Sequence, residues 1–243
     1  MPETGRRQFI TMTPQEEQNR GLTTFQKLKR SNKISGDSAQ QARVRRIGLR
    51  IAAVTPMRNA PWEFLVFQDP EPNAFCLPGG KVGVQSGIFK IATTDAELAA
   101  VLSHEIGHAV ARHSAEQISQ NEAVGLGIGV LSTAVSIGAS AAIGYDPGAG
   151  TVSDVLGTGA NLGFLLPFSR RQELEADRLG LVYMARAGYD PRAAITFWQK
   201  MQARPDNDGG ISFLSTHPVN NRRIAELQKY LPQALAEYEQ TRR

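Results

Sequence analysis

The chain has 243 residues, 41% of them hydrophobic and 21% charged, which is enough apolar material for a packed core in one domain or in one domain with an N-terminal extension. Its single cysteine, Cys76, excludes an internal disulfide and a cysteine-rich zinc ribbon, so any bound metal must use histidine and carboxylate ligands. The net charge of +4 is uneven, because residues 1–50 contain 11 Lys and Arg against 4 Asp and Glu.

The basic residues fall mainly in a predicted helical extension over residues 1–38, ahead of a main domain over residues 39–243. A helix is expected to begin at Pro14, because Thr13 can cap it and acidic side chains follow in its first turn. Its basic face is either solvated, which we favour, or lies against an anionic membrane surface or partner. Nucleic acid is not an expected partner, because no aromatic side chains alternate with the basic ones.

A second helix and a β-hairpin are expected next. Apolar side chains recur at helical spacing among arginines over about residues 39–54, which indicates an amphipathic helix. Residues 62–68 are rich in strand formers, and segments 73–77 and 81–85 flank a Pro-Gly-Gly turn. The hairpin either supports the helix that follows or offers an edge to which an extended peptide adds as a strand. For the second alternative the candidate contacts are Asn73, Ala74 and Phe75.

The most specific motif is His104-Glu105-Ile106-Gly107-His108, in a helix that is expected to begin after Thr94 and to continue to about His113 or beyond. Residues four apart lie on one face of a helix, so both imidazoles can reach one metal ion while Glu105 points to an open coordination position. A catalytic zinc ion usually has three protein ligands, so a third must come from elsewhere. The alternative is an ordinary helix with surface or capping histidines. His113, five residues after His108, leaves the metal-facing side and is interpreted as structural.

Residues 123–143 carry no charge, and Ala, Gly and Ser supply 12 of these 21 positions. The segment is long enough to span a bilayer, but only eight Val, Leu and Ile carry its apolar content. Small residues also allow helices to pack closely. We therefore favour a lid or helical hairpin across residues 123–168, which covers the site or touches a membrane, and regard a transmembrane span as the weaker alternative.

The third ligand is predicted to be Glu173, on a later helix. Asp177 follows on the same face, where it can accept a hydrogen bond from the second ring nitrogen of a ligating histidine, expected to be His104. Nearer the C-terminus, His217 precedes a proline and either caps a helix or faces the metal. Arg222 either stabilises developing oxyanion charge or pairs structurally with a carboxylate.

Several of these segments together resemble the HtpX/Oma/BepA metallopeptidases of peptidase family M forty-eight: residues 96–108, the block Glu173-x-Glu175-Ala176-Asp177, the tripeptide Thr216-His217-Pro218 and the strand–turn–strand at 73–82. The resemblance runs from about residue 6 to about residue 230. It is strongest to the periplasmic BepA/LoiP type and to the Oma-type peptidase core.

The resemblance implies an α+β, mainly α, zincin-like (gluzincin) domain with a small sheet or hairpin beside the zinc helix. It also implies one Zn²⁺ per chain on His104, His108 and Glu173, with Glu105 as catalytic base. In BepA-type members the histidine that corresponds to His217 lies near the zinc and can occupy the fourth position, which holds the enzyme latent. We therefore favour a regulatory or transition-state role for His217.

The sequence thus predicts a zinc metalloendopeptidase that cleaves unfolded or misassembled proteins in quality control of the bacterial envelope. Unfolded proteins or peptides are the expected substrates, and membrane-surface or outer-membrane assembly components are possible partners. The alternative is a zinc-bound chaperone or assembly factor with latent proteolytic activity. Residues 1–7 lack a following apolar signal region, so the chain is either cytoplasmic or a mature exported form. The resemblance favours a periplasmic location, with membrane association left open.

Overall fold

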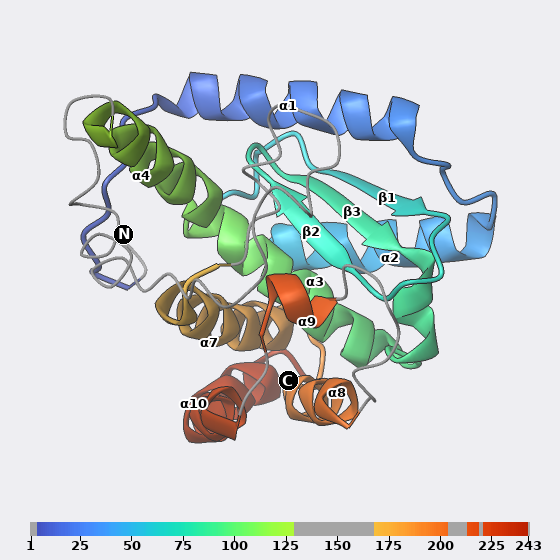
Figure 1. Cartoon of the computed structure of the whole chain (residues 1–243). Helices are drawn as coiled ribbons and strands as arrows, with labels where there is room; N and C mark the ends of the chain where they lie inside the picture. Colours follow the sequence, from blue (N-terminus) through green and yellow to red (C-terminus); the bar gives the residue numbers. More distant parts are fainter. Residues whose placement is uncertain (1–3, 129–167, 204–212, 219–220, 243) are drawn as a thin grey trace.

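The computed structural model describes residues 4–128, 168–203, 213–218 and 221–242 (Figure 1). In chain order its elements are α1 (Pro14–Ser31), α2 (Ser38–Ala52), β1 (Glu63–Phe67), β2 (Ala74–Leu77), β3 (Lys81–Gln85), the 3-10 helix η1 (Ser86–Lys90), α3 (Asp95–Val110), α4 (His113–Ile128), α7 (Arg170–Arg186), α8 (Arg192–Gln202), α9 (Phe213–Thr216) and α10 (Asn221–Gln240). The predicted α+β, mainly α, architecture with a small sheet beside the motif helix is confirmed.

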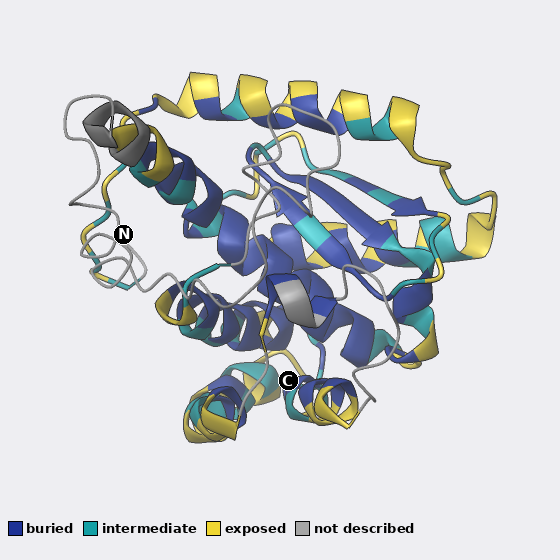
Figure 2. Ribbon diagram, viewed as in Figure 1, coloured by how far each residue is buried: buried dark blue, intermediate teal, exposed yellow. Residues whose placement is uncertain are grey.

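Helix α3 lies at the centre of the fold. Every residue from Glu97 to Ala109 is buried, and Figure 2 shows the same along most of the helix. A surface helix buries only one stripe, so a helix buried on every side needs neighbours all around it. These neighbours are α2 and β2 on one side and α7 and α8 on the other (Figure 1). The polar side chains of the motif are therefore held away from bulk water.

The sheet has the order β1-β3-β2, with β1 parallel and β2 antiparallel to β3. The predicted hairpin is confirmed, since Leu77 pairs with Lys81 across a turn in which Gly79 and Gly80 have φ values of 75° and 76°. Glycine enters this region of φ without steric strain. Strand β2 is one of the two outer strands of the described sheet and packs on α3. The segment 73–75, predicted to contact substrate, therefore lies at the edge beside the motif helix.

The two predicted helix starts are also confirmed. The side chains of Thr13 and Thr94 each accept a hydrogen bond from a backbone N–H of the first turn, and the carboxylates of Glu16 and Glu97 accept one from the backbone N–H of the cap residue. This reciprocal arrangement satisfies two of the amide groups that a helix N-terminus leaves unpaired.

The helix expected to run past His113 ends earlier. Helix α3 stops at Val110, and α4 starts at His113 after a change of direction at Arg112, whose φ is 54°. This left-handed conformation is costly for a residue with a Cβ. A tertiary contact holds it, because Nε of Arg112 donates a hydrogen bond of 2.8 Å to Glu17 of α1. The chain after Arg112 therefore does not continue the line of α3.

Two glycines allow α3 and α7 to lie unusually close. A Cβ on Gly107 would lie 2.9 Å from the carbonyl oxygen of Ala176, and one on Gly180 would lie 3.1 Å from the backbone nitrogen of His104. Both neighbours are backbone atoms that cannot move without moving a helix. The missing side chains therefore set the distance between the two helices.

Most of the lid or helical hairpin predicted over residues 123–168 lies outside the described residues. Within the ranges that the structure does describe, none of the helices is both long and apolar enough to cross a bilayer.

We expect Gly107→Ala to separate α3 from α7. Overpacking of this kind costs about 1–3 kcal/mol, and the better helix propensity of alanine returns only about 1 kcal/mol. The free energy of unfolding, measured by urea denaturation, should fall by about 1 kcal/mol or more. The control is Gly36→Ala, because a Cβ there would have no atom within 4 Å. Equal effects of the two variants would contradict the close contact.

Candidate metal centre

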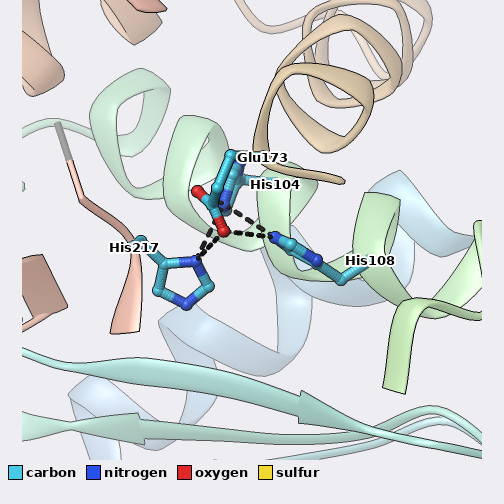
Figure 3. A group of neighbouring side chains, drawn as sticks. All are labelled: His104, His108, Glu173 and His217. Atoms are coloured by element: carbon cyan, nitrogen blue, oxygen red, sulfur yellow. Dashed lines mark hydrogen bonds and ion pairs between the residues drawn. The ribbon is translucent and has the colours of Figure 1, made fainter. Parts of the chain in front are cut away.

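Three elements of the chain bring four side chains to one buried point (Figure 3). Helix α3 carries His104 and His108, α7 carries Glu173, and His217 follows α9. One ligand atom from each of the four lies within 4.8 Å of the other three. Nitrogen and carboxylate oxygen are the ligand types of catalytic zinc sites that lack cysteine.

The two imidazoles from α3 face each other. Their Nε2 atoms lie 3.0 Å apart, and each is 3.4 Å from a carboxylate oxygen of Glu173. Nδ1 of His217 lies 3.0 Å from Oε1 of Glu173 and 3.2 Å from Nε2 of His104. The three predicted ligands, His104, His108 and Glu173, are thus neighbours in the structure.

The other ring nitrogens of the two α3 histidines also have polar neighbours. Nδ1 of His104 lies 2.9 Å from Oδ1 of Asp177, one turn after Glu173 on α7. Nδ1 of His108 lies 2.9 Å from Nδ1 of His113. A proton on each Nδ1 leaves both Nε2 lone pairs directed at each other and at the Glu173 carboxylate. A cation at this point would balance such a convergence of lone pairs, so the donor set fits a divalent metal ion.

Burial and nearby charge set the ionisation of the ligands. Burial lowers the pKa of the His108 imidazole well below its usual value, which favours the neutral ring that binds metals. Burial would raise the pKa of Glu173, yet the charges of Arg223 and His217 hold it well below the usual value. Glu173 is therefore a carboxylate in a site where an unpaired charge would be strongly unfavourable.

Glu105 has a different environment. Burial raises the pKa of its carboxyl group to about 7. Its Oε1 lies 3.4 Å from Nε2 of His217, and its carboxylate accepts a hydrogen bond from the backbone N–H of Cys76 in β2. The carboxylate next to the ligand cluster is thus poised to exchange a proton near neutral pH.

The arginine in this cluster is Arg223, not the neighbouring Arg222. The Arg223 side chain is 3% exposed, its guanidinium binds Asp177 through bonds of 2.8 and 2.7 Å, and its Nη1 lies 2.7 Å from Glu173. It also stacks 3.9 Å from the ring centre of Trp198. Arg222 is exposed and lines a small pocket that opens beside Glu173. The catalytic role predicted for Arg222 stays a prediction, and the carboxylate pairing belongs to Arg223.

His113 lies outside the ligand cluster, in keeping with its interpretation as a structural residue, and it contacts Nδ1 of His108 directly. The reason is the break at Arg112, which redirects the chain after α3. Helical periodicity could not predict this contact, because a prediction from periodicity assumes that the helix is unbroken.

The predicted substrate segment lies beside the cluster. Asn73 and Ala74 are buried, and Phe75 is half-buried and stacks on Phe67 of β1 with ring centres 6.1 Å apart. Two amide groups of this strand are already engaged, since the N–H of Ala74 donates to Oδ1 of Asn73 and that of Cys76 donates to Glu105. Peptide binding along this edge stays a prediction.

Comparison with known proteins agrees with this chemistry. The sequence profile of peptidase family M48 matches residues 38–231. The mitochondrial metalloendopeptidase OMA1 of Schizosaccharomyces pombe is 42% identical over 192 residues, which cover 79% of this chain and 53% of the relative. OMA1 of Saccharomyces cerevisiae is 40% identical over 188 residues, which cover 74% and 50%. The β-barrel assembly-enhancing protease of Escherichia coli is 29% identical over 230 residues, which cover 93% and 46%.

These comparisons correct one expectation. The chain spans about half the length of these relatives. A periplasmic location was predicted from the resemblance to BepA/LoiP-type proteins, but the relatives with the higher identities are named as mitochondrial proteins. The periplasmic prediction is therefore wrong.

We expect Arg223→Gln to destabilise the metal-free protein strongly. The substitution leaves the buried carboxylates of Glu173 and Asp177 without their shared cation, and breaking a buried pair costs about 3–5 kcal/mol. Arg222→Gln removes the same charge from an exposed side chain and should change the free energy of unfolding by less than about 0.5 kcal/mol. Urea denaturation measures both variants. A larger effect at Arg222 would show that the roles of the two arginines are reversed.

Proposed function

This chain belongs to peptidase family M48, and on that premise we propose that it is a zinc-dependent endopeptidase that cleaves unfolded or misassembled proteins. The observation that carries the proposal is the convergence of His104, His108 and Glu173 on one buried point, with the Glu105 carboxylate beside it. The narrower prediction of quality control in the bacterial envelope depended on the periplasmic location and is given up with it.

In this proposal His104, His108 and Glu173 hold one Zn²⁺ per chain, and Asp177 orients His104. When bound, zinc polarises a carbonyl group and lowers the pKa of water at its open position toward neutrality. The division into a 1–38 extension and a 39–243 peptidase domain is part of the proposal.

Glu105 is proposed as the general base. Its pKa of about 7 suits a group that takes a proton from water and later delivers it to the leaving amine, because both transfers are then close to balanced at neutral pH. The hydrogen bond from the Cys76 amide orients the carboxylate from the side of β2. An extended substrate added along β2 would lie next to this carboxylate, and backbone pairing would explain a preference for unfolded chains over particular sequences.

His217 is proposed as a latch. One of its ring nitrogens lies within 4.8 Å of the ligand atoms of His104, His108 and Glu173, and Nε2 lies 3.4 Å from Glu105. In this position the ring occupies the space that water and substrate need. A chaperone or assembly factor with latent activity is the second candidate. The same closed arrangement favours it, because a chain that kept His217 in place would bind clients without cutting them.

Cleavage of unfolded casein separates the two candidates. We expect zinc-loaded wild-type protein to cut casein, a chelator to abolish cutting, and added Zn²⁺ to restore it. Glu105→Gln should lower the rate by at least about 100-fold, the smaller end of the contribution of a general base, while zinc stoichiometry stays at one. Cutting by the variant at the wild-type rate would remove Glu105 from the mechanism.

We expect His217→Ala to raise the rate of casein cleavage several-fold at saturating Zn²⁺, because the latch is absent. Initial rates and zinc stoichiometry are measured on the same samples. A lower rate with zinc still bound would assign His217 to stabilising the reaction instead of restraining it. If neither wild type nor this variant cuts although zinc is bound, the chaperone candidate replaces the peptidase.

A further inference from the structure

Behind His108 stands a row of buried polar side chains that the proposed reaction does not use. Nδ1 of His113 lies 2.9 Å from Nδ1 of His108, and its Nε2 lies 3.0 Å from Oε2 of Glu175. His113 is completely buried. A buried imidazole with a polar partner on each nitrogen is fixed in both rotation and tautomer.

The partners admit one arrangement of protons. His108 presents Nε2 to the ligand cluster, so its Nδ1 carries the proton and donates to Nδ1 of His113. The proton of neutral His113 is then on Nε2 and donates to Glu175. The Glu175 carboxylate also accepts hydrogen bonds from the Thr4 hydroxyl and from Nε of Arg6, so an acceptor that receives three donors ends the row.

Arg6 holds this end of the row. Its Nε donates to Glu175 at 2.7 Å, and its two Nη atoms bind the two carboxylate oxygens of Glu116 at 2.6 Å each. Without the guanidinium, the largely buried carboxylates of Glu175 and Glu116 would have no cation between them. Such an unbalanced pair would repel and move apart.

Arg6 belongs to an N-terminal segment (residues 4–11) that joins the two sides of the site. Thr4 and Arg6 bind Glu175 of α7, whereas Gln8 donates to the carbonyl oxygen of Ala111 and Thr11 binds Ser119 of α4. The segment therefore ties the helix that follows the motif to the helix that carries Glu173.

The arrangement repeats the one on the other ligand. His104 contacts Asp177, which contacts Arg223. His108 contacts His113, which contacts Glu175, and Glu175 contacts Arg6. Each ligating histidine thus leads to a carboxylate that an arginine neutralises. The second row differs in having one more imidazole and in taking its arginine from the start of the chain.

We infer that His113 is a positioning residue for the metal ligand His108, and that Arg6 of the N-terminal segment acts through Glu175 to hold His113 in place. The inference rests on the proposed metal site. Residues 4–11 of the proposed extension would then support the metal site of the peptidase domain.

The test measures metal binding by the full chain, with Zn²⁺ in competition with a chromophoric chelator and with the visible absorption of bound Co²⁺. His113→Phe keeps a buried ring but removes both hydrogen bonds. We expect it to weaken Zn²⁺ binding by about 10–100-fold, the usual effect of losing the partner of a ligating histidine, and to change the Co²⁺ spectrum. His113→Gln can accept from His108 and donate to Glu175, so it should retain most of the affinity.

Arg6→Gln tests the second step, and Arg7→Gln is its control, because the neighbouring side chain is exposed and loses the same charge. We expect weaker Zn²⁺ binding only for the change at Arg6. Because Arg6 acts through His113, the double variant should bind Zn²⁺ no more weakly than His113→Phe alone.

Two results would overturn the inference. Zn²⁺ affinity and Co²⁺ spectra that stay at wild-type values in His113→Phe would show that His113 only fills space. Effects of the two substitutions that add in full would show that Arg6 does not act through His113. If His113→Phe fails to fold by circular dichroism, the comparison of Arg6→Gln with Arg7→Gln decides alone. Failure of wild type to bind Zn²⁺ would instead reject the proposed function.

Discussion

The contact between α3 and α7 is the constraint on which the rest of the site depends. Two of the proposed ligands come from α3 and the third from α7, so their ligand atoms meet only if the two helices approach closely. Gly107 and Gly180 permit this, because no Cβ separates the backbones at these positions. The sheet and α2 support α3 from one side, and α8 and α10 complete the packing on the other. Close packing of the two helices thereby brings Glu173 next to the two histidines that lie four residues apart on α3.

The same packing creates an electrostatic problem that the fold solves only in part. Three carboxylates, those of Glu105, Glu173 and Asp177, are removed from water, and burying unpaired charge is strongly unfavourable. Arg223 neutralises Glu173 and Asp177, which keeps their pKa values low. At Glu105 the nearby His217 and Arg223 lower the pKa less than burial raises it, so the pKa is about 7. The carboxylate whose burial is least compensated is the one whose proposed role requires it to take up and release a proton.

The sequence was sufficient where the information is local. Helical spacing within one element brought His104 together with His108 and, on a second element, Glu173 with Asp177, and turn and cap residues located the hairpin and the helix starts. It was insufficient where a distant contact decides the geometry. The direction of the chain after α3 depends on Arg112 and its bond to Glu17 of α1, so periodicity could not predict the contact between His113 and His108. The choice between Arg222 and Arg223 needed only the phase of α10, which the buried Leu227, four residues after Arg223, could have supplied.

The proposed peptidase activity requires that the buried site admit a polypeptide, so some of the contacts around it must break more easily than others. The residues on α3 and α7 sit in packed helices, whereas His217 lies on the short stretch between α9 and α10. Arg223 holds that stretch through the carbonyl oxygens of His217 and Pro218, at 3.3 and 3.1 Å, and each such bond from a charged donor to a neutral acceptor contributes about 1.5–3 kcal/mol net. Its bonds to Asp177 are bidentate, charged and buried, so they are much harder to break. Under the proposed latch, His217 can therefore move away while Arg223 remains on Asp177 and the side chains of α3 and α7 stay in place.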